Sequence, residues 1–149
     1  MLKKINMLTG FKHLHSYFAY LLLAVLIIGI LFNFLAFMQG KSYSNTNRKF
    51  ALYGLMATHI QVLFGLILYF VSPLGISALS GEAMKDSTSR LYALEHPLMM
   101  ILAVVLVTIG YSKSKKATAD ARKFRIQLAF YAVALVFILS RIPWAAWPH

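Results

Sequence analysis

The chain has 149 residues, of which 60% are hydrophobic and only 13% are charged. A soluble domain of this length needs far more polar surface, so the composition excludes that class and indicates an integral membrane protein. The formal net charge is +11, but the basic residues flank apolar runs, which is typical of loops beside membrane helices and argues against nucleic-acid binding. The absence of cysteine excludes zinc–thiolate sites, iron–sulfur clusters and covalently attached haem, while haem b held by histidine stays open.

Four apolar runs follow one another along the chain. We predict membrane-spanning helices at about residues 14–38, 49–72, 91–112 and 123–143, each close to the roughly 20 residues that a bilayer requires. The first run is too long for the apolar part of a cleaved signal peptide, so it predicts a true span. Because the connections are short, consecutive helices should be antiparallel neighbours. The predicted fold class is all-α: residues 1–149 form a single transmembrane domain, an up-down four-helix bundle.

The basic residues are distributed unevenly between the two ends of this bundle. The first and third loops carry nine of them, namely Lys41, Arg48, Lys49, Lys113, Lys115, Lys116, Arg122, Lys123 and Arg125. The two terminal segments and the second loop carry six, namely Lys3, Lys4, Lys12, Lys85, Arg90 and Arg141. Because basic loops tend to stay in the cytoplasm, we expect a multi-pass protein of the bacterial inner (cytoplasmic) membrane with both termini in the periplasm. The three N-terminal lysines argue the other way.

The first predicted helix carries one inward-facing stripe. At 100° per residue, the stripe comprises His15, Ala19, Leu22, Leu26, Gly29 and Asn33. Small residues between polar ends are typical of a surface that packs against other helices in lipid. His13 points away from the stripe, among Tyr17 and Tyr20, which are typical of the membrane interface.

The second predicted helix has two distinct faces. One face is small and polar and comprises Gly54, Thr58, Gln61, Gly65, Tyr69 and Ser72. The other is centred on His59, within an apolar run, and the two centres lie roughly 120° apart. A titratable ring at that depth is costly and usually has a function or a partner. Gln61 and His59 therefore need not share a partner.

The third predicted helix is interrupted near its start, where Pro97 follows His96. Proline disfavours the helical conformation of the preceding residue and removes a backbone donor. The helix should therefore begin at Pro97 or kink there, and a kink would free the Ala93 carbonyl and tilt His96. On the fourth helix, Arg141 ends an inward stripe and Pro143 ends the helix.

An even alternation of spans brings His15, His96, Arg90 and Arg141 toward one membrane face. Haem b needs an apolar slot, axial imidazoles and cations for its propionates, and the chain offers all three. The candidate iron ligands are His15, His59 and His96, and Arg90 and Arg141 are expected to meet the propionates. Depth limits the pairs, because His96 lies about 7 Å and His15 about 18 Å nearer the outer face than His59.

Structural roles compete with these assignments. His15 and His96 also fit interfacial histidines bonded to headgroups or water, and His59 fits an interhelical hydrogen bond. Glu95 fits either an acceptor that orients the neighbouring imidazole or a solvated loop charge. Arg141 fits either a side chain that reaches lipid phosphate or a propionate ligand.

Four segments give the chain a family resemblance. They are His13-Leu-His-Ser-Tyr, Thr58-His59-Ile-Gln61, Arg90-Leu-Tyr-Ala-Leu-Glu95-His96-Pro97 and Ser140-Arg141-Ile-Pro143-Trp144. The chain resembles, over essentially its whole length, small four-span Bacteroidetes membrane proteins labelled "cytochrome b". In arrangement it is loosely similar to the membrane-bound, oxygen-independent protoporphyrinogen oxidases and to the copper-resistance D proteins. The resemblance implies haem binding and redox work carried by His15, His59 and His96.

The function expected from the sequence is electron transfer by His-ligated haem b, with a quinone or a partner protein as redox partner. The alternative from another class is a cofactor-free accessory subunit of a larger respiratory or transport complex. A metal or proton transporter would use His59 as a relay, but no acidic residue accompanies it in the membrane. An enzyme acting on a porphyrin is a further alternative. Because so small a bundle buries little surface, a homodimer or a membrane complex is expected alongside contact with the lipid bilayer.

Overall fold

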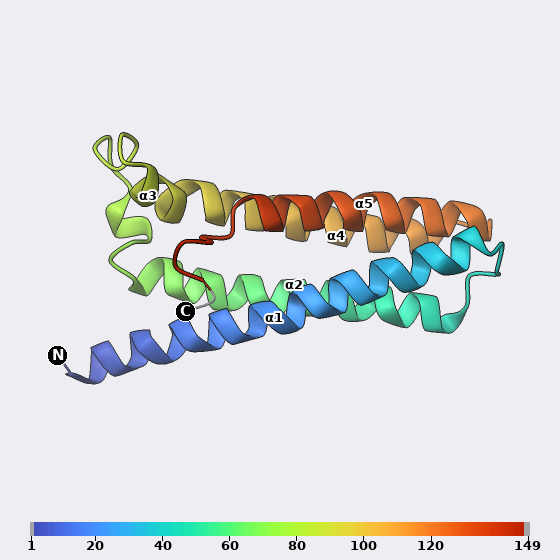
Figure 1. The fold of residues 1–149 in the computed structure, drawn as a ribbon, viewed down its shortest axis with the longest axis horizontal. Coiled ribbons are helices and arrows are strands. Elements are labelled where there is room, and N and C mark those ends of the chain that lie inside the picture. Colours follow the sequence, from blue (N-terminus) through green and yellow to red (C-terminus); the bar gives the residue numbers. More distant parts are fainter. Residues whose placement is uncertain (1, 148–149) are drawn as a thin grey trace.

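The computed structural model describes residues 2–147, and within them it is helical with no strand. Its elements are α1 (Leu2–Met38), α2 (Asn45–Val71), η1 (Ile76–Ala78), α3 (Ser87–Arg90), η2 (Leu91–Glu95), α4 (His96–Lys116) and α5 (Asp120–Ser140). The long helices run alternately up and down along one axis, as Figure 1 shows. The all-α four-helix bundle is therefore confirmed.

Four segments are long and apolar enough to cross a membrane, namely Met7–Met38, Asn45–Val71, Ser87–Lys116 and Asp120–Ser140. All four begin earlier than the sequence predicted, at residues 7, 45, 87 and 120 rather than about 14, 49, 91 and 123. Nothing in the first segment breaks a helix, and α3, η2 and α4 follow one another without a gap, which extends the third segment back to Ser87.

Local sequence signals fix the helix ends. Gly40, which adopts a positive φ of 63°, follows α1 where a left-handed residue commonly terminates a helix. Ser44 and Asn47 form a reciprocal capping box at the start of α2: the Ser44 side chain accepts from the Asn47 amide, and the Asn47 side chain accepts from the Ser44 amide. Pro143 follows the end of α5, where it cannot continue the helix.

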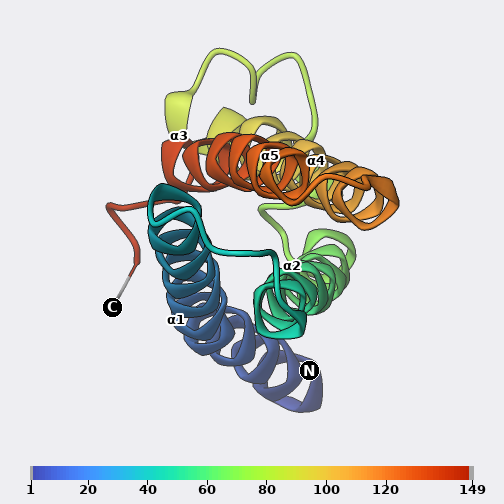
Figure 2. The same cartoon turned by 90° about the vertical axis from the view of Figure 1, so that its right-hand side faces the viewer.

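The predicted inward stripes form the core. Viewed along the bundle, α4 and α5 lie side by side over α1 and α2 (Figure 2). Buried residues from the four stripes meet between these layers, among them Leu26, Thr58, Gln61, Val107, Gln127 and Tyr131. Tyr131 donates a 2.7 Å hydrogen bond to the Ala51 carbonyl, which ties α5 to α2. The helical periodicity of the sequence predicted these faces correctly.

The outer surface is apolar. Large hydrophobic side chains stay more than half exposed along the helices, including Leu21, Ile28, Leu31, Leu35, Leu63 and Val136. A soluble monomer does not carry apolar surface on this scale. Together with the four spans, this surface describes a multi-pass membrane protein whose helices contact the lipid bilayer.

Candidate cofactor pocket between α1, α2 and α4

His15 and His96 lie next to one another in the bundle. Their rings are 6.2 Å apart between centroids and meet edge to face. The sequence placed both on one membrane face but assigned them depths about 11 Å apart. The structure corrects that offset, because neighbouring rings on α1 and α4 lie at similar levels along the bundle.

A wide helical turn directly precedes His96. Residues Leu91–Glu95 form one π-helical turn, a feature that often occurs at functional sites. Pro97 lies in the first turn of α4 and has no amide hydrogen. The Ala93 carbonyl, which the sequence predicted to be freed, accepts from the Tyr69 hydroxyl at 3.0 Å.

A backbone carbonyl fixes the proton on His96. Its Nδ1 lies 2.7 Å from the carbonyl oxygen of Arg141. Because a carbonyl only accepts hydrogen bonds, Nδ1 must carry the proton and donate it. In neutral His96 the other ring nitrogen, Nε2, then holds the lone pair that a metal requires. Metal-binding histidines typically donate their second ring N–H to a carbonyl or carboxylate in the same way.

Gln61 and Gly65 position His15 from α2. The Gln61 amide donates to the His15 backbone carbonyl at 2.9 Å, and its nitrogen also lies 3.4 Å from Nε2 of the ring. A Cβ added at Gly65 would lie 3.2 Å from His15 Cε1, so the ring occupies space that only glycine leaves free. Within the described part of the chain, His15 Nδ1 and Gln61 Oε1 are buried without a hydrogen-bond partner.

A cavity of about 460 Å³ opens beside the two histidines. It lies among α1, α2, α4 and the C-terminal segment, toward the end of the bundle where the chain begins (Figure 1). Its wall is mainly apolar, with polar groups from the small, polar face of α2. These include Thr58, Gln61 and Tyr69. Few, convergent polar groups in an apolar cavity are typical of a cofactor or small-molecule site.

His59 lies outside this pocket. It is exposed on the outer surface of α2, where Nδ1 is 2.8 Å from the Leu55 carbonyl oxygen and Nε2 is 3.5 Å from the Thr108 hydroxyl. Thr108 is twelve residues after His96 on α4, which is about 18 Å along the helix axis. The structure therefore does not bring His59 to His15 or His96, because His59 lies on the other face of α2, away from the face that lines the pocket.

Arg90 and Arg141 share one carboxylate rather than pointing into the cavity. Arg90 Nε lies 2.8 Å from Glu95 Oε1, and Arg141 Nε lies 3.2 Å from Oε2. The three side chains are each roughly 30–40% exposed (38%, 42% and 30%). Glu95 is thus neither a free loop charge nor the acceptor that orients His96, and the cluster keeps one net positive charge beside the pocket.

Several residues of the site were not singled out as site residues from the sequence. Gln61, Gly65 and Tyr69 lie on the small, polar face of α2. The helical period predicts that they share this face, but it does not predict which residues of other helices they contact. Trp147 also lines the cavity and donates to the Ser16 carbonyl at 3.2 Å. That contact closes the C-terminal segment over α1, and no local sequence pattern indicates it.

The two imidazoles are the part of the site that could hold a cofactor. A porphyrin brings four nitrogens of its own and takes one or two further ligands from the protein. His15 and His96 are candidates for that role, since both line the cavity. Within the described residues, no group of three or more His, Cys, Asp or Glu side chains is placed to hold an ion.

No protein-family model, no curated protein and no solved structure matches this chain.

Proposed function

We propose that the chain binds haem b through His96 and His15 and transfers electrons within the membrane. The observation that carries the proposal is the pairing of two imidazoles, 6.2 Å between centroids, at the wall of an intramembrane cavity. Haem takes one or two imidazoles from the protein as iron ligands, and His15 and His96 would supply them.

His96 would be the principal ligand, because the Arg141 carbonyl already holds its Nδ1 proton and orients the ring. His15 would be the second ligand and would give up its 3.4 Å contact with Gln61. Arg90 and Arg141 would contribute the net positive charge of their cluster with Glu95 to the propionates. Bound haem b supplies one-electron exchange at its iron, while the apolar wall excludes water.

The proposed membrane and orientation rest on the distribution of basic residues along the chain. We place the chain in the bacterial inner membrane with both termini in the periplasm, because nine basic residues flank the first and third loops against six elsewhere. The redox partner would be a quinone or a partner protein that approaches the end of the bundle nearest the pocket. Electron transfer itself needs no substrate site in the chain.

A cofactor-free accessory subunit of a larger membrane complex is the competing function. The outward-facing His59 favours it, since a polar ring exposed on an apolar helix surface suits an interhelical contact with another protein. In that case the purified chain would be colourless and would copurify with partners at fixed stoichiometry.

The test is the visible spectrum of the purified protein, oxidised and then reduced with dithionite, with a pyridine assay for haem type and stoichiometry. We expect haem b in the wild type, loss of haem in His96→Ala, and a change from six-coordinate to five-coordinate iron in His15→Ala. His59→Ala is the matched control and should keep the wild-type spectrum. A colourless wild type expressed with adequate haem supply, or full haem in both pocket variants, would refute the proposal.

A further inference from the structure

A second cavity lies at the opposite end of the bundle and is basic rather than apolar. Its volume is about 370 Å³, and it is enclosed by the first loop, the start of α2, the end of α4 and the start of α5. We call it the basic pocket and define it by its lining residues, which are Tyr43, Ser44, Asn45, Arg48, Tyr111, Ser114, Lys115 and Lys123. None of them belongs to the histidine pocket.

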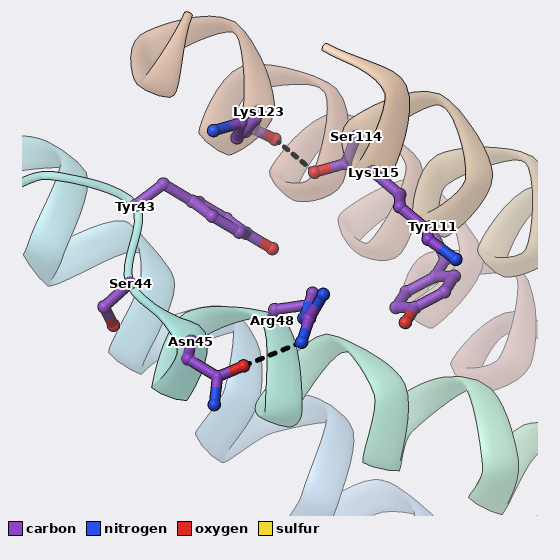
Figure 3. Close-up of a pocket in the computed structure, with 8 residues that line it drawn as sticks. All are labelled: Tyr43, Ser44, Asn45, Arg48, Tyr111, Ser114, Lys115 and Lys123. Atoms are coloured by element: carbon purple, nitrogen blue, oxygen red, sulfur yellow. Dashed lines mark hydrogen bonds between the residues drawn. The ribbon is translucent and has the colours of Figure 1, made fainter. Parts of the chain in front are cut away.

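The side chains of the basic pocket converge from two sides. Figure 3 shows Tyr43 and Arg48 reaching from the first loop and α2 toward Tyr111 and Ser114 on α4. Several contacts hold the walls in place: Tyr43 donates to the Gln127 side chain at 2.6 Å, and Ser114 donates to the Lys123 carbonyl at 3.0 Å. The walls are therefore preformed around an open centre.

The charge of this pocket is unbalanced. Three of the lining side chains are cations and none is a carboxylate. Lys123 pairs with the nearby Asp120 at 2.9 Å, whereas Arg48 and Lys115 form no ion pair within the described part of the chain. Arg48 donates a 2.9 Å hydrogen bond to the neutral Asn45 side chain. Two cations without an ion pair, together with the Tyr111 hydroxyl, make an environment for a phosphate.

The position of the basic pocket at the ends of the spans indicates that the phosphate belongs to a lipid headgroup. The starts of α2 and α5 and the end of α4 mark where the spans leave the membrane, which is the depth of lipid headgroups. The same two helices, α2 and α4, continue into exposed apolar side chains, among them Met56, Leu63, Val105 and Ile109. Basic pockets between transmembrane helices bind anionic headgroups, with acyl chains lying along the apolar surface beside them.

We propose that the basic pocket binds the phosphate headgroup of an anionic phospholipid. Arg48 and Lys115 are the principal cations of the site, and the Tyr111 hydroxyl offers a hydrogen bond to a remaining phosphate oxygen. This inference is independent of haem and holds for either orientation of the chain in the membrane.

The experiment measures lipid binding to the purified full chain in a neutral detergent at about 0.15 M salt. Dioleoylphosphatidylglycerol, dioleoylphosphatidylcholine and inorganic phosphate are titrated separately, and bound ligand is counted by native mass spectrometry. The pocket variant is Arg48→Gln with Lys115→Gln. The matched control, Lys49→Gln with Lys116→Gln, removes the same two charges from the adjacent positions, about 100° around each helix and outside the pocket.

We expect saturable binding of phosphatidylglycerol to the wild type at about one lipid per chain. The pocket variant should bind it roughly twenty-five-fold more weakly, at about fivefold for each of the two cations removed. The control should change affinity by less than about twofold, because charges outside the pocket are screened beyond about 8 Å. Each single variant, Arg48→Gln or Lys115→Gln, gives the fivefold step should the double variant fail to fold.

Three results would overturn the inference. Equal losses in the pocket variant and the control would show general surface attraction rather than a site. Equal affinity for phosphatidylcholine would remove the selection for an anion. Inorganic phosphate binding as tightly as phosphatidylglycerol would assign the pocket to a soluble anion instead of a lipid headgroup.

Discussion

The hydroxyl of Tyr69 donates a 3.0 Å hydrogen bond to the Ala93 carbonyl, across the contact between α2 and the third span. Ala93 is completely buried, and Pro97 cannot supply the amide that an unbroken helix would offer to this carbonyl. Tyr69 thus supplies a donor to the carbonyl that Pro97 leaves without its helical amide.

Replacing Tyr69 by phenylalanine should destabilise the fold by about 1 kcal/mol, because it leaves a buried carbonyl without a donor. The free energy of unfolding in mixed detergent, followed by circular dichroism, measures the effect. Tyr53→Phe is the matched control, since Tyr53 is 51% exposed on the same helix. An equal change in the two variants would contradict the role assigned to the Tyr69 hydroxyl.

Substituting Gly65 by alanine should displace His15. The new Cβ would lie 3.2 Å from His15 Cε1, closer than carbon atoms ordinarily approach, so the ring must move toward the cavity. On the proposed function we expect an altered axial coordination spectrum with the helical content unchanged. Gly10→Ala on α1 meets nothing within 4 Å and should leave the spectrum as it is.

The contact between α4 and α5 depends on Gly110. A Cβ at this position would lie 2.5 Å from the Cβ of Phe130, which rotation of the Phe130 side chain cannot relieve. Gly110→Ala should therefore force the two helices apart and cost about 1–3 kcal/mol of stability. Gly29→Ala provides the comparison, because its Cβ would meet Phe50 at an ordinary 3.6 Å. Unfolding midpoints in detergent should fall only in the first variant.

The cap of α3 should respond to pH. Asp86 accepts a 2.7 Å hydrogen bond from the Ser89 amide, which lowers the pKa of the Asp86 carboxyl below its ordinary value of 3.8. Its stabilising contribution is complete above the ordinary pKa and is lost as the pH falls through the lower pKa of the folded protein. The Ser89 amide resonance should titrate with a midpoint below 3.8. Asp86→Asn should abolish this titration, and a midpoint above 3.8 would contradict it.

The sequence by itself determined the properties that arise within one segment. Apolar run lengths gave four spans, and the helical period gave the faces that bury Leu26, Thr58 and Gln127. Pro97 predicted the free Ala93 carbonyl, because a missing amide is a covalent property of the residue. The alternation of spans placed His15 and His96 on one side of the membrane.

Only the tertiary structure decided which of these groups meet. The depth and rotation of each helix depend on side chains of other helices, such as Tyr131 and Leu26 closing on Gly54, and no single-helix pattern contains that information. Packing brought His15 to His96 and left His59 on the outer surface. It also joined Arg90 and Arg141 through Glu95, and it gathered distant cations into the basic pocket.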